Sequence, residues 1–271
     1  MLTAYLILLS CLSLGIYYLI LDSSGAFSSA DMTDLGRGLF YVIILAEIFM
    51  ATFIPPSFTA GAISGERERK TYELLRTTLL SARQLVLGKL YASLGFITLL
   101  ILSALPLETI ALAIGGVTLT ELIASQVLVL VTAFSFATIG MTVSSFVRTT
   151  TVSNVITYVI STLVNTVQPI VVLMVGGIAA SALSVNHYHW IVQSILAYMA
   201  VFGVSLSPVS AAIASEIMLE EEHSLWYFWQ AVDGHRIPIP SSWLIYVLIY
   251  ALGSLLLLLV SILRVRQRDV K

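Results

Sequence analysis

Cysteine and charge are both scarce in this sequence of 271 residues. The single cysteine, Cys11, excludes an internal disulfide and any metal site built from several cysteines. Charged residues make up 10% of the chain, whereas a soluble domain carries about a quarter. The formal net charge of −2 offers no electrostatic basis for binding nucleic acid. Because 58% of the residues are hydrophobic, lipid must be the solvent for most of the surface.

Long apolar runs predict six membrane-spanning helices, since a bilayer core requires roughly 20 apolar residues per helix. The six runs are residues 2–21, 39–63, 85–114, 119–147, 152–183 and 243–263. No basic residue precedes the first run, which is also longer than the roughly 7–15 residues of a signal-peptide core. We therefore expect it to be retained as a span. The predicted fold is an all-α integral membrane protein, with residues 1–271 forming a single transmembrane domain.

A further apolar stretch, at 190–219, is broken in its middle by Ser205-Leu206-Ser207-Pro208. Proline removes a backbone donor and disfavours helix at the residue before it. A complete crossing here would also place the basic C-terminal tail on the opposite side from the other basic loops. We therefore predict that the region of about 187–240, between the fifth and sixth spans, is an outer re-entrant or interfacial helical hairpin.

The distribution of basic residues predicts the orientation, because cytoplasmic loops are enriched in Lys and Arg. With the N-terminus inside and six crossings, eleven of the 13 basic residues lie in the cytoplasm. They are Arg67, Arg69, Lys70, Arg76, Arg83, Lys89, Arg148, Arg264, Arg266, Arg268 and Lys271. Both termini are therefore predicted to be cytoplasmic. The four tryptophans then fall near the outer interface, as an aromatic belt predicts.

The loop after the second predicted span is the most strongly charged part of the chain. Glu66/Lys70 and Arg69/Glu73 are opposite-charge pairs at i and i+4, each worth roughly 0.2–0.5 kcal/mol in a helix. The sequence Ser81-Ala-Arg-Gln has the form of a capping box, which would begin the third span as a separate helix. We predict an amphipathic cytoplasmic helix at about 65–80. A membrane-surface helix without a protein partner is the alternative interpretation.

Four motifs follow one another in and around this loop. Pro55 is followed by Glu66-Arg-Glu-Arg-Lys-Thr-Tyr-Glu, then by Thr77-Thr-Leu-Leu-Ser, and then by Gly88-Lys. With these motifs the chain resembles the permeases of the ABC-2 type exporter family. The family has a proline-containing segment, a Glu-Arg-Glu-x-Gly-Thr-x-Glu-like stretch, a Thr-Thr-Pro-x-Ser-like turn and a Gly-Lys in this order. Lys70 stands where the family often has Gly, and Leu79 stands where it often has Pro. Pro106 with Gly115-Gly-Val, and the Ser207-Pro pair, are similar as well, so that the resemblance covers nearly the whole chain.

The resemblance implies a membrane subunit of an ATP-driven exporter whose loop helix docks, as a coupling helix, on a separate ATPase. It also implies two ATPase copies and a second permease, either identical (a homodimer) or paralogous (a heterodimer), in the prokaryotic inner membrane. ATP and Mg would bind to the partner ATPase, and this chain would bind no cofactor. Membrane lipid would surround its spans. The expected docking residues are Glu66, Arg67, Glu68, Thr71, Tyr72 and Glu73.

Sequence signatures of an enzyme are missing. The segment 65–71 lacks the second glycine of a Walker loop and follows a membrane span instead of a strand, and no His-Glu-x-x-His motif occurs. The four histidines, His187, His189, His223 and His235, all lie between the fifth and sixth predicted spans, where we expect solvated side chains and no metal site. No catalytic residue is predicted. A non-transporting sensor or scaffold, and an intramembrane enzyme, are the alternative functions.

Polar residues within the spans are candidates for a translocation pathway. Glu47 lies within the second span and Glu108 within the third, where a charge is costly. Six polar residues of the fifth span step by three or four and so share one helical face: Thr150, Asn154, Thr157, Ser161, Asn165 and Gln168. By resemblance, the second and fifth spans line the pathway, so we expect this face, from Asn154 onward, and Glu47 to line it. Helix packing through interhelical hydrogen bonds is the alternative for both.

Overall fold

The computed structural model describes residues 7, 10, 11, 14, 15, 18, 29–71, 81–185, 190–222, 226–232 and 235–269. These residues form two compact units. The first, which we call the bundle unit, comprises the described parts of Met1–Thr157 and Ser254–Lys271. The second, the hairpin unit, comprises those of Tyr158–Gly253. The single transmembrane domain expected from the sequence stays a prediction, because packing units need not be separate domains.

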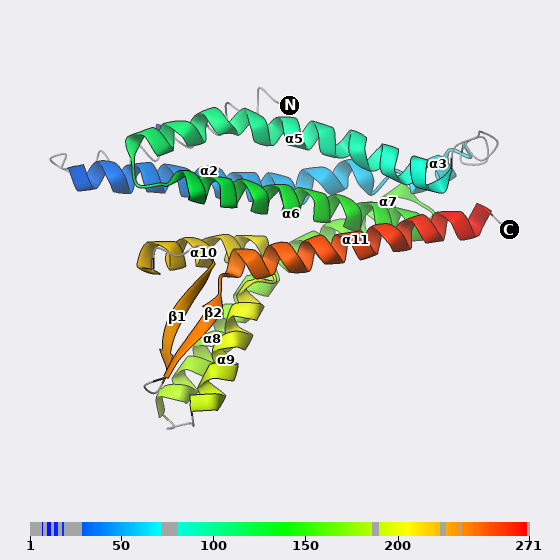
Figure 1. The fold of residues 1–271 in the computed structure, drawn as a ribbon. Coiled ribbons are helices and arrows are strands. Elements are labelled where there is room, and N and C mark those ends of the chain that lie inside the picture. Colours follow the sequence, from blue (N-terminus) through cyan, green and yellow to red (C-terminus); the bar gives the residue numbers. More distant parts are fainter. Residues whose placement is uncertain are drawn as a thin grey trace. The chain divides into compact units, whose positions relative to one another are not determined.

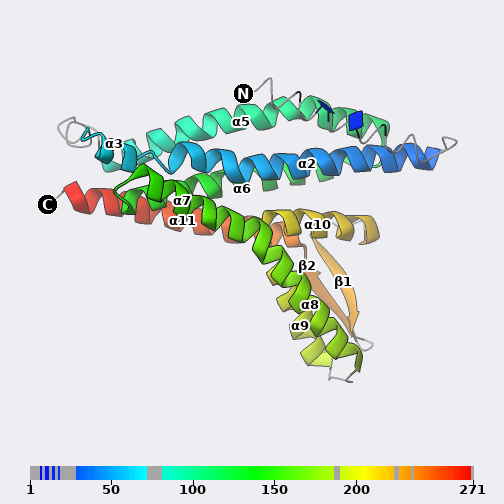
Figure 2. The ribbon, with the colours of Figure 1, turned by 180° about the vertical axis from the view of Figure 1, so that it is seen from behind.

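Three long helices make up most of the bundle unit: α2 (Ser29–Thr59), α5 (Ala82–Ile114) and α6 (Leu119–Phe146). They run side by side, and each packs against the other two (Figure 1 and, from behind, Figure 2). A short helix, α3 (Ser64–Glu68), follows α2. The first part of α7 (Thr150–Thr162) and the last part of α11 (Ser242–Asp269) complete the unit.

The capping box predicted at the start of the third span is present. Ser81 Oγ accepts a hydrogen bond from the Gln84 backbone N–H, and Gln84 Oε1 accepts one from the Ser81 N–H at 2.9 Å. Thr118 and Glu121 repeat this arrangement at the start of α6. Each box satisfies backbone N–H groups that have no partner within the helix. Both helix starts are therefore fixed by local sequence.

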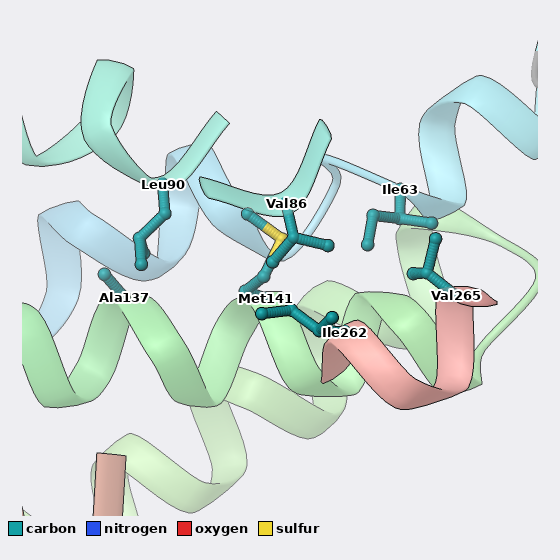
Figure 3. Close-up of a cluster of buried hydrophobic side chains, with 7 residues drawn as sticks. All are labelled: Ile63, Val86, Leu90, Ala137, Met141, Ile262 and Val265. Atoms are coloured by element: carbon teal, nitrogen blue, oxygen red, sulfur yellow. The ribbon is translucent and has the colours of Figure 1, made fainter. Parts of the chain in front are cut away.

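One hydrophobic cluster connects four parts of the bundle unit. Figure 3 shows side chains from the α2–α3 turn, α5, α6 and α11 converging at this point. The cluster consists of Ile63, Val86, Leu90, Ala137, Met141, Ile262 and Val265. All seven are at most 8% exposed. Because Ile63 directly precedes α3, this packing fixes the start of α3 against the longer helices.

Glycine allows α2 to approach its neighbours closely at two points. A Cβ atom on Gly140 of α6 would clash with Thr59 Oγ1 and come within 3.2 Å of the Ala60 backbone nitrogen. A Cβ atom on Gly36 of α2 would clash with the carbonyl oxygen of Gly115, in the turn between α5 and α6. Neither position can take a larger residue without moving a helix.

The hairpin unit contains a π-helical turn η1 (Leu163–Val167), the helices α8 (Gln168–Val185), α9 (Trp190–Val204) and α10 (Pro208–Glu222), and the strands β1 (Tyr227–Val232) and β2 (His235–Pro240). Helix α9 packs against α8, α10 and both strands (Figure 1). The strands pair antiparallel, with Tyr227 opposite Pro240. The break between α9 and α10 falls at 205–207, as predicted. Whether the two helices re-enter the membrane stays a prediction.

The prediction of an all-α chain did not include the β-hairpin. Its second strand reads His-Arg-Ile-Pro-Ile-Pro, with prolines at 238 and 240. A proline disfavours helical backbone at the residue before it and favours an extended conformation there. The alternating prolines therefore exclude a helix at 235–240. The prediction from apolar run length did not take these prolines into account.

Within the described residues, five helices are long and apolar enough to cross a membrane. They are Gly36–Glu68, Ala82–Ile114, Leu119–Phe146, Thr150–Gly177 and Ser242–Arg266. They overlap the second to sixth spans predicted from the sequence, and they indicate a multi-pass membrane protein. The first predicted span, 2–21, falls mostly on residues outside the described ones, so the count of six stays a prediction.

Candidate functional site

The short helix α3 is held at its start by the end of α6. The backbone N–H groups of Ile63 and Ser64 donate to Ser144 Oγ at 2.9 and 3.0 Å. The hydroxyl groups of Ser64 and Ser144 lie 3.2 Å apart, and both residues are fully buried. One serine of α6 therefore satisfies the first N–H groups of α3, which have no partner within that helix.

The last three residues of α3, Glu66 to Glu68, contact three different helices. The first, Glu66, forms an ion pair with Lys89 of α5, with 2.8 Å between Oε1 and Nζ. Lys89 Nζ also donates to the Ala62 carbonyl, and Thr71 Oγ1 donates to Glu66 Oε2 at 2.5 Å. Glu66 therefore ties α3 to the first turns of α5. The predicted pairing of Glu66 with Lys70 is wrong, because the carboxylate is directed to Lys89 and Lys70 is exposed.

Arg67 caps the C-terminal end of α6. Its Nη1 donates to the carbonyl oxygens of Ser145 and Val147 at 3.0 and 3.1 Å. The last carbonyls of a helix have no partner within the helix, and the macrodipole favours a cation at this end. Arg67 supplies both the donor and the positive charge.

Glu68 binds the N-terminal end of α7. Its Oε2 accepts hydrogen bonds from the backbone N–H of Thr150 at 3.0 Å and from the Thr150 hydroxyl at 2.7 Å. A carboxylate at the start of a helix satisfies a free N–H and is favoured by the macrodipole. We call Glu66, Arg67 and Glu68 the α3 clamp, since together they attach α3 to α5, α6 and α7.

The helix predicted over 65–80 does not run unbroken. Helix α3 ends at Glu68, and Lys70 has a φ of 60°, in the left-handed region. That conformation costs a non-glycine residue roughly 1–2 kcal/mol relative to the right-handed one. The prediction of one continuous helix over 65–80 is therefore wrong at Lys70. This is the position where the family that the loop resembles often has Gly. Tyr72, Glu73 and the rest of 72–80 lie outside the described residues, so their part in docking stays a prediction.

A polar groove adjoins the α3 clamp and has a volume of about 680 Å³. Its walls come from the end of α2, α3, α5 and the start of α7. The lining residues are Ser57, Phe58, Gly61, Ala62, Gly65, Glu66, Glu68, Arg69, Lys89, Thr150 and Asn154. Asn154 Oδ1 is buried and has no hydrogen-bond partner among the described residues. The groove therefore offers an unused acceptor next to the α3 clamp.

The polar face predicted on the fifth span is present in its first half. Thr157 and Ser161 are fully buried, as is Ser153 on the same face, whereas Val155 and Val159 on the other side are more than half exposed. The π-helical turn η1 interrupts this face, because a π turn adds a residue to the helical repeat. Asn165 lies inside this turn, and Gln168 directly after it donates to the Gly203 carbonyl at 2.5 Å.

Glu47 lies in the interior of the bundle unit. It is 1% exposed, and its Oε2 accepts a hydrogen bond from Gln126 Nε2 of α6 at 2.9 Å. The same nitrogen donates to Glu108 Oε1 of α5 at 2.7 Å, and Glu108 is fully buried. A contact with neighbouring spans was the alternative interpretation of Glu47. Sequence reasoning missed Gln126, although an amide in the middle of an apolar run is itself a sign of an interhelical contact.

Within the hairpin unit, His235 stacks on Trp190 with 4.6 Å between ring centroids. The other three histidines lie outside the described residues. No group of three His, Cys, Asp or Glu side chains that could hold a metal occurs in the part of the chain that the structure describes.

Comparison with known families gives one match over almost the entire chain. The family model described as ABC-2 family transporter protein matches residues 2–265. A search of the curated proteins finds no match.

Proposed function

Because the chain belongs to the ABC-2 family of transporter proteins, we propose that it is the permease of an ATP-driven exporter and is coupled through α3 to a separate ATPase. Proteins of this family are membrane components of transporters, and such a permease normally works with an ABC ATPase. The direction of transport and the coupling through α3 are our proposal. The observation that supports it best is the α3 clamp.

The α3 clamp is suited to passing on a mechanical displacement. Three consecutive side chains bind α5, α6 and α7, and the backbone at the start of α3 binds α6 through Ser144. A partner that displaced α3 would therefore move the ends of three spans together. A flexible loop would absorb such a displacement, because its backbone dihedrals could change without moving the spans.

The proposed orientation places α3 and both termini in the cytoplasm, because the basic residues concentrate in the loops and tail on that side. The prokaryotic inner membrane is proposed from the family resemblance. Glu66, Arg67 and Glu68 are partly used inside the chain, so we assign them a positioning role in addition to docking. The direct contacts with the ATPase would then fall on the neighbouring exposed Arg69, on Thr71, and on Tyr72 and Glu73. ATP and Mg would bind to that partner.

A second permease copy would complete the pathway, with two ATPases in the whole assembly. Only 6% of the most apolar part of Thr150–Gly177 is buried within the chain, against 50% for the span that contains α2. The fifth span therefore keeps most of its surface available for lipid or for another subunit. We propose that the polar face of this span and Glu47 contribute to the path, and that the exported cargo is amphipathic.

The test is to purify the chain from its native membrane in detergent and to identify the proteins that accompany it by mass spectrometry. We expect an ATPase with a Walker motif. In the double variant Arg67→Gln/Glu68→Gln, ATPase should still bind through the remaining surface, but its stimulation by the permease should fall at least about tenfold, since a coupling of 1.4 kcal/mol or more would be lost. The variant Arg83→Gln, exposed at the start of α5 and outside both the α3 clamp and the proposed docking residues, is the matched control for stimulation.

Two outcomes would contradict the proposal. If no ATPase accompanied the chain in several detergents, a sensor or scaffold function would take its place. If the double variant stimulated the ATPase as well as the unmodified chain, the α3 clamp would not be the coupling element.

A further inference from the structure

Two carboxyl groups and one amide meet in the interior of the bundle unit, on three different helices. Glu47 of α2 and Glu108 of α5 each accept a hydrogen bond from the same nitrogen, Nε2 of Gln126 on α6. The two glutamates are 1% and 0% exposed. Because both acceptor oxygens bind one nitrogen atom, the two carboxyl groups are close neighbours. We call these three residues the carboxyl–amide cluster.

No cation compensates the two carboxyl groups within the described residues. On α2, Arg37 is ten residues from Glu47, about 15 Å along the helix, and bonds to the Gly116 carbonyl. On α5, Lys89 is paired with Glu66, about 28 Å along the helix from Glu108. On α6, Glu121 belongs to the capping box with Thr118. In the N-terminal segment, Cys11 and Tyr18 are described and are exposed.

Each carboxyl group also has an unused oxygen. Glu47 Oε1 and Glu108 Oε2 are buried and have no hydrogen-bond partner within the part of the chain that the structure describes. Gln126 has two amide hydrogens, and the two glutamates take both of them. Two ionised carboxylates at this place would leave two charges and two acceptors without donors in a medium of low dielectric, which is strongly unfavourable.

We propose that the carboxyl–amide cluster is a proton-binding site, in which Glu47 and Glu108 together hold at least one proton inside the membrane bundle. A protonated carboxyl group loses its charge and gains an O–H donor for the neighbouring carboxylate. The bound proton would thus form a hydrogen bond between Glu47 of α2 and Glu108 of α5, and Gln126 joins both to α6. A metal cation fits less well, because the amide directs its N–H groups at both carboxylates. The site shares no residue with the α3 clamp, and the proton-binding proposal does not depend on the proposed path role of Glu47.

The first test measures thermal unfolding of the full chain in lipid nanodiscs from about pH 5 to about pH 9, a range that covers buried carboxyl groups. Release of the proton leaves a charge in the folded interior, so the Tm should fall as the pH rises, by roughly 3–5 °C per pH unit for one proton. The double variant Glu47→Gln/Glu108→Gln should lack this fall, since the amides are neutral at every pH. Glu121→Gln, on an exposed part of α6, is the matched control and should behave as the unmodified chain.

Infrared difference spectroscopy of the unmodified chain gives a second and direct measurement, which is independent of whether the double variant folds. A carbonyl stretch of a neutral carboxyl group should be present at neutral pH, should be absent from the double variant, and should persist in Glu121→Gln. The proposal is overturned if the unmodified chain shows no such band at neutral pH, or if the folded double variant keeps the full fall in Tm. Stabilisation by added Na⁺ at constant ionic strength, with no response to pH, would identify a metal cation site instead.

Discussion

Helix α6 and the fifth span both carry a row of polar residues, but the two rows differ in burial and in hydrogen bonding. In the most apolar part of α6, 56% of the residues are buried within the chain, against 6% for Thr150–Gly177. Six hydroxyl residues of α6 donate to carbonyl groups of their own helix: Ser125, Thr132, Ser135, Thr138, Thr142 and Ser145. Two of them also reach α11: Thr142 Oγ1 lies 3.2 Å from the Leu257 carbonyl, and Ser135 Oγ lies 3.5 Å from Ser254 Oγ. The row on α6 is therefore a packing surface.

The fifth span leaves several of its polar atoms without partners. Asn154 Oδ1, Ser161 Oγ and Gln168 Oε1 are buried from solvent and have no hydrogen-bond partner among the described residues. An unsatisfied buried polar group is costly, so these atoms are the candidates on this span for contacts with cargo or another subunit. The difference shows that polarity along a helical face does not by itself identify a pathway, and the pathway role of the fifth span stays a prediction.

The largest effect in this comparison is expected from a single methyl group. Gly140→Ala on α6 would force Thr59 and the backbone at Ala60 away, at a cost of about 1–3 kcal/mol. The matched change on the fifth span is Gly176→Ala, because a Cβ atom there meets nothing within 4 Å. It should be neutral or stabilise by up to about 1 kcal/mol, since alanine favours helix. Thermal unfolding in nanodiscs measures both, and equal losses would remove the distinction between the two helices.

A second pair of variants separates packing from transport. Thr142→Val on α6 removes a hydroxyl whose single hydrogen lies between the Thr138 carbonyl at 2.7 Å and the Leu257 carbonyl at 3.2 Å, so stability should fall by about 1 kcal/mol while transport by the intact complex changes little. Ser161→Ala on the fifth span removes a buried hydroxyl that has no hydrogen-bond partner among the described residues. Stability should therefore change little, whereas transport per ATP hydrolysed should fall. If Ser161→Ala transports normally while its stability drops, the polar face of the fifth span is a packing surface like that of α6.

Several elements could be predicted from the sequence because their causes are local. The capping box at Ser81 needs only a hydroxyl and a glutamine three residues apart. The break between α9 and α10 follows from the segment Ser205-Leu206-Ser207-Pro208, and Pro208 begins α10. Five of the predicted spans follow from apolar run length, which a bilayer fixes at roughly 20 residues. Each of these features is complete within a few neighbouring residues or within one length criterion.

The remaining features depend on contacts between distant residues. Arg67 finds its acceptors 78 and 80 positions further along the chain, and Gln126 bridges residues 79 and 18 positions away. Helical periodicity predicted an ion pair between Glu66 and Lys70, one turn away, whereas Glu66 forms its ion pair with Lys89 of α5. The π-helical turn η1 likewise divides a face that an ideal helical repeat treats as continuous. Docking by 72–80 and the pathway role of Glu47 stay predictions.

The smallest expected effect concerns the end of α3, the helix whose α3 clamp binds both α6 and the start of the fifth span. Lys70 directly follows the C-cap residue Arg69 and has a φ of 60°, whereas Arg69 has a φ of −80°. Lys70→Gly should therefore stabilise the chain by a few tenths to about 1 kcal/mol, because relief of the left-handed strain exceeds the entropy that glycine adds to the unfolded state. Arg69→Gly is the matched control and should destabilise slightly, since its backbone is already in the right-handed region. Thermal unfolding of both variants measures the difference. Stabilisation by both, or by neither, would show that the end of α3 is not strained, and the left-handed residue would then not explain why α3 stops before the docking segment.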